Sequence, residues 1–264
     1  MEIVLLLEVF QSDLLRLFLS KRLKPNNKTK RKMKIYCVPG LANDKRVFDK
    51  LGPMLISQDI TFLEHIAPSN PTESMKDYAK RLIADITDFE ENSVIIGMSL
   101  GGIISVEISK LLPMKKVFLI STIKHPNEFP WQIKMLKNLP LKKVQLPAWL
   151  IRKSLKPVAW LLGVTDSTGR AHIQSMIDSA SEDHIAWAQY AAANWDNRLI
   201  PNNYVHIHGT KDEIFPAAYV RASHFIEGGN HYMIMERAKE VAQIINTELE
   251  KILAVNKVQS LKMR

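Results

Sequence analysis

A single cysteine, Cys37, rules out a disulfide bond within this chain. A long uninterrupted apolar run is also missing: the most apolar stretch, residues 3–19, contains Glu8, Asp13 and Arg16, so it is a poor membrane span. No positive charge precedes this stretch and no small-residue cleavage site follows it, which argues against a secretory signal. We therefore expect a cytoplasmic protein, a reducing environment that suits a lone thiol.

The sequence lacks a basic domain, although its net charge is +9. Residues 1–34 hold nine Lys and Arg but three Asp and Glu, and residues 251–264 hold four basic residues and no acid. The body between them, 35–250, carries 23 basic and 24 acidic residues. A nucleic-acid-binding domain presents a basic face within the fold, so we expect no nucleic-acid partner and interpret the basic ends as solvated tails.

Residues 1–32 form a basic amphipathic extension with three possible explanations. In helical projection, its apolar residues between Ile3 and Phe18 share one side, which suits a helix lying on an anionic membrane. The same face could pack on the body or on a partner. The abrupt start of an apolar strand at Met33 favours a third hypothesis, that translation begins there and the extension is not native. Intact mass of the native protein tests this, because a product containing residues 1–32 would rule it out.

The spacing of apolar residues predicts short strands that alternate with longer helices along the chain. The sequence predicts strands at 34–38, 59–66, 93–98, 115–121, 203–209 and 222–227. It predicts helices at 43–57, 74–89, 100–111, 131–138, 147–162, 170–180, 182–194, near 216–221 and at 234–254.

This order predicts an α/β fold with a doubly wound, mostly parallel sheet of about six strands. Residues 33–121 and 201–255 would form the core of the fold. Residues 122–200, which hold all five tryptophans, interrupt the rhythm and would form a helical cap, and residues 256–264 would be a basic C-terminal tail.

The stretch "IIGMSLGG" (residues 95–102) places Ser99 between an apolar strand and a predicted helix. A serine hydroxyl is a weak nucleophile unless a neighbouring base takes its proton. A sharp strand-to-helix turn presents it, and the small residues Gly97 and Gly101 satisfy the steric need of that turn. The five-residue pattern alone is weak, but the strand before it and the helix after it favour a nucleophile over an ordinary glycine-rich turn.

A carboxylate and a base follow in the order that such a serine requires. Asp212 lies in the loop after the 203–209 strand, next to a rival carboxylate, Glu213. His231 lies in the loop between the last strand and the last helix. Because two adjacent side chains seldom point at the same histidine, we choose Asp212 as the acid and His231 as the base.

Two backbone amides could stabilise the negative charge that develops on a carbonyl oxygen. The Leu100 N–H lies at the start of a helix, where the helix dipole assists. The Leu41 N–H follows Pro39-Gly40 in the loop after the first strand.

The remaining residues that could carry chemistry give weaker signals. His206 and His208 share one side of a strand, but no third ligand at a sensible spacing completes a metal site. Cys37 lies within a strand and is expected to serve packing. We therefore expect no metal and no cofactor.

Four motifs in order, "VPGLAND", "IGMSLGG", "HIHGTKDEIFP" and "GGNHYMIMERA", resemble the α/β-hydrolase superfamily over about residues 33–254. More narrowly, the chain is similar to small bacterial α/β hydrolases of unassigned substrate. By position, Ser99 matches the family's nucleophile, Asp212 its acid and His231 its base, while Leu41 and Leu100 match its oxyanion-hole donors.

This sequence departs from the family pattern in two ways. Two N-terminal strands are missing, and the oxyanion loop reads Pro-Gly where many relatives have His-Gly. Neither departure removes a catalytic group.

The resemblance implies a carboxylesterase-like serine hydrolase that cleaves an ester or a related acyl bond through an acyl-enzyme. A cap rich in Trp and Leu suggests an apolar acyl or alcohol group on a small-molecule substrate. Two alternatives stay open: the same three residues could serve C–C bond cleavage, elimination or acyl transfer, or the fold could serve only for ligand binding or interaction. Neither the substrate nor the oligomeric state follows from the sequence.

Overall fold

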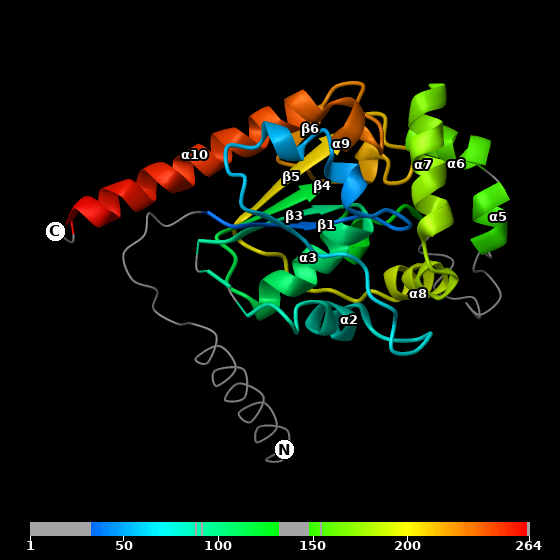
Figure 1. Cartoon of the computed structure of the whole chain (residues 1–264), viewed down its shortest axis with the longest axis horizontal. Helices are drawn as coiled ribbons and strands as arrows, with labels where there is room; N and C mark the ends of the chain where they lie inside the picture. The colour runs from blue at the N-terminus through cyan, green and yellow to red at the C-terminus, as the bar shows by residue number, and fades with distance from the viewer. Residues whose placement is uncertain (1–32, 88, 91, 132–147, 154, 263–264) are drawn as a thin grey trace, which may run out of the picture.

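A computed structural model describes residues 33–87, 89–90, 92–131, 148–153 and 155–262. Its centre is one six-stranded sheet in the order β2-β1-β3-β4-β5-β6, in which every adjacent pair is parallel (Figure 1). The strands are β1 (Ile35–Val38), β2 (Ile60–Phe62), β3 (Val94–Met98), β4 (Lys116–Ile120), β5 (Tyr204–Gly209) and β6 (His224–Ile226). The predicted fold class, a doubly wound α/β fold with about six strands, is confirmed.

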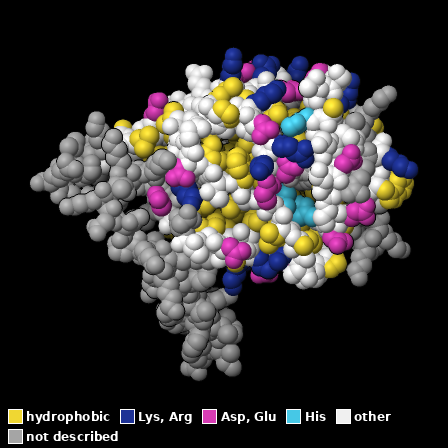
Figure 2. All heavy atoms as spheres, in the orientation of Figure 1, with side chains coloured by type: hydrophobic (Ala, Val, Ile, Leu, Met, Phe, Trp, Pro, Cys, Tyr) yellow, Lys and Arg dark blue, Asp and Glu magenta, His cyan; other side chains and the backbone are white. Residues whose placement is uncertain are grey.

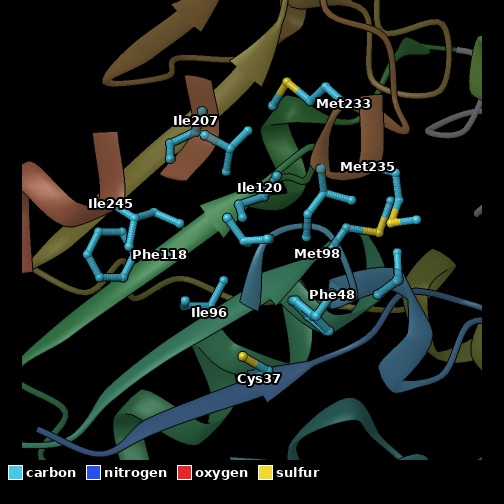
Figure 3. Packing of buried hydrophobic residues seen from close by; sticks show 14 of the residues in the cluster. Cys37, Phe48, Ile96, Met98, Phe118, Ile120, Ile207, Met233, Met235 and Ile245 are labelled. Carbon is cyan, nitrogen blue, oxygen red and sulfur yellow. The ribbon is translucent and has the colours of Figure 1, made fainter. Parts of the chain in front are cut away.

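The central strands β1 and β3 are buried at every position, which explains their continuous apolar sequence. Because side chains alternate along a strand, the sheet has a separate core on each face. On one face Cys37, Ile96 and Phe118 pack against Phe48 and Ile245 (Figure 3). Burial raises the pKa of the Cys37 thiol, so this cysteine acts as a small apolar side chain.

Helices cover both faces of the sheet. The helices α2 (Met75–Leu82) and α3 (Leu100–Leu111) pack on one face, as the core around Tyr78 and Ile104 shows. The helices α9 (Met233–Glu236) and α10 (Ala238–Lys262) cover the other face together with the 3-10 turn η1 (Lys45–Phe48), and α10 runs along the top in Figure 1.

Four described helices follow β4 and precede β5 in the sequence. In Figure 1 they lie beyond the arrowheads of the strands. They are α5 (Ala148–Lys153), α6 (Leu155–Leu162), α7 (Ser167–Ser179) and α8 (Glu182–Ala193). Two of them begin with a side-chain cap: Asp166 accepts the Gly169 N–H and Ser181 accepts the His184 N–H. The bounds of a cap at residues 122–200 stay a prediction. The extension at 1–32 lies outside the described residues, and so does the predicted helix at 131–138 except for Trp131.

Several predicted elements are wrong in type or length. The segment predicted as one helix, 43–57, contains two 3-10 turns, η1 and η2 (Gly52–Met54). Pro53 has no N–H to donate to a helical carbonyl, so an α-helix cannot run through this segment. The predicted helix near 216–221 is likewise a 3-10 turn, η5 (Ala217–Tyr219), after Pro216. A further 3-10 turn, η3 (Pro126–Glu128), follows β4, and α2 ends seven residues before the predicted limit.

The described surface shows no area dominated by one charge in the view of Figure 2, where acidic and basic side chains are interspersed. This agrees with the nearly neutral body that the sequence indicates. Within the described part of the chain, no helix combines the length and the apolar character needed to cross a bilayer.

Candidate active site

Loops that follow four strands bring the predicted site residues to the carboxyl edge of the sheet. Leu41 follows β1, Ser99 lies between β3 and α3, Asp212 follows β5, and His231 lies between β6 and α9. In a parallel sheet all these loops leave the same edge, so residues up to 190 positions apart in sequence meet there.

Ser99 sits on a sharp turn with φ 52° and ψ −120°. This left-handed conformation is unfavourable for a non-glycine residue and costs about 1–3 kcal/mol. The turn leaves no room for a side chain at its neighbours: a Cβ at Gly97 would collide with the Gly101 carbonyl, and a Cβ at Gly101 would collide with the Val38 carbonyl. Glycine at both positions is thus a steric requirement of this turn.

Thr122 supports the turn from the loop after β4, because its hydroxyl donates to the Ser99 carbonyl oxygen at 2.6 Å. Its methyl group also lies where a Cβ at Gly102 would be placed. In the sequence, the only signal for this residue is its place directly after a predicted strand.

Ser99, His231 and Asp212 form a continuous hydrogen-bonded chain. The Ser99 Oγ lies 2.9 Å from His231 Nε2. On the other side of the ring, His231 Nδ1 lies 2.9 Å from Asp212 Oδ2 and 3.0 Å from Oδ1. A neutral imidazole that donates from Nδ1 to the carboxylate has Nε2 free to accept the serine proton, which is the arrangement that activates a serine.

The surroundings of Asp212 suit the contact with His231, whereas those of the rival carboxylate, Glu213, do not. Asp212 is buried, and its Oδ1 accepts the N–H groups of Ile214 and Phe215, both at 2.9 Å. Burial by itself raises the pKa of the Asp212 carboxyl, but the charge and hydrogen bond of His231 outweigh it and hold that pKa below its usual value. Glu213 is exposed. The structure therefore places Asp212, and not Glu213, against the histidine.

Leu41 and Leu100, whose amides the sequence proposes as oxyanion donors, both line the cavity above Ser99. Among the described residues, neither N–H takes part in a hydrogen bond. Leu100 is the first residue of the twelve-residue helix α3, so its N–H lies at the positive end of the helix dipole. Both amides are thus available to a substrate oxygen.

A cavity of about 390 Å³ opens above Ser99 and His231. Most of its described lining is aliphatic or aromatic, and none of those residues carries a formal charge. The apolar lining is Leu41, Ala42, Met98, Leu100, Ile103, Phe129, Val158, Leu162, Ile173, Ile177, Ile185, Ala188, Ala192, Ala193, Ile214 and Phe215. The sequence suggested that tryptophans contribute to apolar binding, but none is among these residues. Trp187 and Trp195 are buried in the core, and Trp131, Trp149 and Trp160 are exposed.

His206 and His208 are fully buried on β5, with ring centroids 5.5 Å apart. Each donates from Nε2 to a backbone carbonyl, His206 to Thr122 at 3.0 Å and His208 to Phe215 at 2.7 Å. His208 also lies 3.7 Å from Asp212 Oδ2. In the described part of the chain, no cluster of three or more His, Cys, Asp or Glu side chains is placed to hold a metal ion.

The rings of two further histidines, His65 and His184, are in contact, with centroids 4.2 Å apart and planes tilted by 34°. Burial lowers the pKa of His65 to about 4, against the opposing effect of its bond to the Gly40 carbonyl. Burial and the neighbouring His65 lower the pKa of His184 to about 3. Both rings are therefore neutral at pH 7.

These two side chains predict a loss of stability in mild acid. Between pH 6.5 and about 4 the unfolded chain binds protons that the folded chain does not, so the free energy of unfolding falls as the pH is lowered. Relative to pH 7.5, each ring is expected to cost on the order of 2 kcal/mol at pH 5. Urea unfolding at the two pH values measures the loss, and His184→Phe should reduce it substantially. An equal loss in wild type and variant would contradict this assignment.

Comparison with known proteins agrees with the geometry of the fold. A sequence profile described as the alpha/beta hydrolase family matches residues 35–244. A search of curated protein sequences finds no match.

Solved structures of the same fold include several esterases. A thermophilic esterase from Thermogutta terrifontis is 17% identical, with a TM-score of 0.61, over 83% of this chain and 90% of that chain. An esterase from Exiguobacterium antarcticum is 12% identical, with a TM-score of 0.62, over 83% of this chain and 92% of its own. A lipase-esterase related protein from Clostridium acetobutylicum is 18% identical, with a TM-score of 0.60, over 84% and 96%. At these identities the likeness concerns the fold.

The fold and the site together define a class: a parallel α/β protein that presents a serine on a strained strand-to-helix turn beside a histidine. The family profile covers most of the chain and makes the class specific. The chain belongs to the alpha/beta hydrolase family, as its motifs suggested.

Proposed function

We propose that this protein is a carboxylic-ester hydrolase that uses Ser99 as nucleophile, His231 as base and Asp212 as the acid that orients it. The observation that carries the proposal is the 2.9 Å contact between Ser99 Oγ and His231 Nε2, with Asp212 bound to the opposite ring nitrogen. This contact lies at the floor of an apolar cavity, which suits a neutral acyl compound. The esterases of the same fold support the reaction class.

The reaction would proceed in two halves. His231 Nε2 takes the proton as Ser99 Oγ bonds to the ester carbonyl carbon, and the Leu41 and Leu100 amides stabilise the resulting oxyanion. The oxyanion collapses, the C–O bond to the alcohol breaks, and His231 returns its proton to that alcohol. Water then attacks the acyl-serine while His231 takes its proton. The bond from the acyl carbon to Ser99 Oγ breaks, His231 returns the proton to Ser99 Oγ, and the acid leaves.

A panel of p-nitrophenyl esters from acetate to decanoate tests this function. We expect turnover, and kcat/KM should rise about fourfold for each added methylene until the cavity is filled, because burying one CH₂ contributes about 0.8 kcal/mol. Absence of turnover with every ester would contradict the proposal and would favour the lyase or acyl-transfer alternatives.

The cavity makes a separate prediction about chain length. Ala193 borders the cavity at the end of α8, so Ala193→Leu should shorten the usable space. We expect the ratio of kcat/KM for hexanoate to that for acetate to fall about tenfold or more, since a misplaced methylene costs about 1–3 kcal/mol in an apolar pocket. Ala171→Leu, at an exposed position of α7, serves as control and should leave the ratio unchanged. Equal ratios in all three proteins would place the acyl chain elsewhere.

A further inference from the structure

The peptide unit between Gly40 and Leu41 carries one of the two amides that would bind the oxyanion. A peptide bond is planar, and in a trans unit its C=O and N–H point in opposite directions. Whatever holds the Gly40 carbonyl oxygen therefore also sets the direction of the Leu41 N–H. Rotation of this unit would turn the N–H away from the substrate and direct a carbonyl oxygen toward the oxyanion.

The Gly40 carbonyl oxygen is held by two N–H donors. His65 donates from Nε2 at 2.9 Å, and the Asn43 N–H donates at 3.1 Å. The Asn43 bond closes a turn within the same loop, whereas His65 comes from the loop after β2, 25 residues away. His65 is therefore the contact that ties this peptide to the rest of the fold.

The loop after β1 needs such a stabilising hydrogen bond because its own backbone conformation is unfavourable. Ala42, directly after the peptide in question, has φ 55°, in the left-handed region that alanine disfavours. Gly40 lies against the nucleophile, since a Cβ at this position would be 3.2 Å from Ser99 Cβ. A shift of the loop that contains Gly40 would therefore displace the Ser99 side chain or change its contacts.

The His65 ring is itself held in place from the cap side. Its Nδ1 lies 3.4 Å from the Tyr78 hydroxyl, and the tilted His184 ring of α8 contacts it with ring centroids 4.2 Å apart. Trp187, one turn further along α8, stacks on the Tyr78 ring at 3.9 Å. These contacts fix the orientation in which Nε2–H faces Gly40, and they join α8 to the loop that carries the oxyanion-binding amide.

We propose that His65 is a positioning residue that holds the Gly40–Leu41 peptide with its N–H directed at the substrate oxyanion. The inference rests on the proposed ester hydrolysis and adds to it a residue that none of the four family motifs contains. A hydrogen bond to Gly40 O also polarises the peptide, which makes the Leu41 N–H a stronger donor. Since the oxyanion exists only in the tetrahedral species, His65 should affect kcat far more than substrate binding.

His65→Phe tests the proposal, because it keeps a ring against His184 but removes the donor. Loss of an oxyanion donor typically costs about 10²–10³ in kcat, so loss of its positioning is expected to cost about 10- to 100-fold. With p-nitrophenyl butyrate, KM should stay within about twofold. The inhibition constant of a trifluoromethyl ketone, which forms a tetrahedral adduct, should rise by the same factor as kcat falls. His65→Gln retains an N–H donor and should recover part of the rate.

The matched control is His224→Phe, the same substitution at an exposed position of β6. His224 is not among the residues that line the cavity, so this change should leave kcat within about twofold. If His65→Phe does not fold, as circular dichroism would reveal, His65→Met replaces it as the donor-free variant. Unchanged kcat in a folded donor-free variant would overturn the proposal, and so would a kcat loss without weaker ketone binding. If Ser99→Ala retained full turnover, the proposed function itself would fail, whatever the His65 variants do.

Discussion

Ser99→Ala is expected to lower kcat for p-nitrophenyl butyrate by about 10⁶-fold, the size of the loss when a serine nucleophile is removed. Without the hydroxyl, His231 has no proton to accept and no acyl-enzyme can form. The described contacts of Ser99 Oγ involve only His231, and the bond from Thr122 reaches the Ser99 backbone, so the fold should be unaffected. Initial rates and thermal unfolding of the same preparation measure both effects.

Ser109→Ala is the matched control, because Ser109 lies on the same helix with its hydroxyl bonded to the Val106 carbonyl. This variant should retain wild-type kcat. A Ser99→Ala protein that keeps more than about a tenth of the wild-type rate would exclude Ser99 as the nucleophile.

Asp212→Asn is expected to lower kcat by about 10⁴-fold with little change in KM, as the equivalent change does in other serine triads. The asparagine amide would face His231 Nδ1 with a donor, which favours the tautomer whose Nε2 carries the proton and cannot act as base. The asparagine oxygen can still accept the Ile214 and Phe215 N–H groups, so the loop should keep its conformation. Steady-state kinetics at pH 8 provide the measurement.

The neighbouring carboxylate supplies the control for this prediction. Glu213→Gln makes the same chemical change one residue away, at an exposed side chain, and should alter kcat by less than about twofold. A large loss in Glu213→Gln with a near-normal Asp212→Asn would reverse the assignment of the acid.

The central elements of the fold follow from the sequence because burial dictates their composition. The strand at 93–98 is apolar on both faces because helices cover both faces of the sheet, and the glycines around Ser99 are forced by backbone contacts. The order of Ser99, Asp212 and His231 was sufficient to predict which residues meet, since parallel strands bring their following loops to one edge.

What the sequence failed to predict depends on contacts between distant segments. The bond from His65 to Gly40 spans 25 residues and has no local signature, so the sequence does not single out this histidine. The sequence does not show which tryptophans of residues 122–200 are buried and which are exposed. Only tertiary packing distinguishes the buried Trp187 from the exposed Trp160. The helix predicted at 43–57 is wrong because Pro53 lies within this segment and has no N–H to donate to a helical carbonyl.

Covalent labelling tests the central claim, an activated Ser99, most directly. The native protein is treated with a fluorophosphonate, digested, and analysed by tandem mass spectrometry. The proposed mechanism predicts one phosphonate on the peptide that contains Ser99, rapid in wild type, strongly slowed in Asp212→Asn and absent in Ser99→Ala. No labelling in wild type, or labelling of another residue at the same rate in Ser99→Ala, would contradict it.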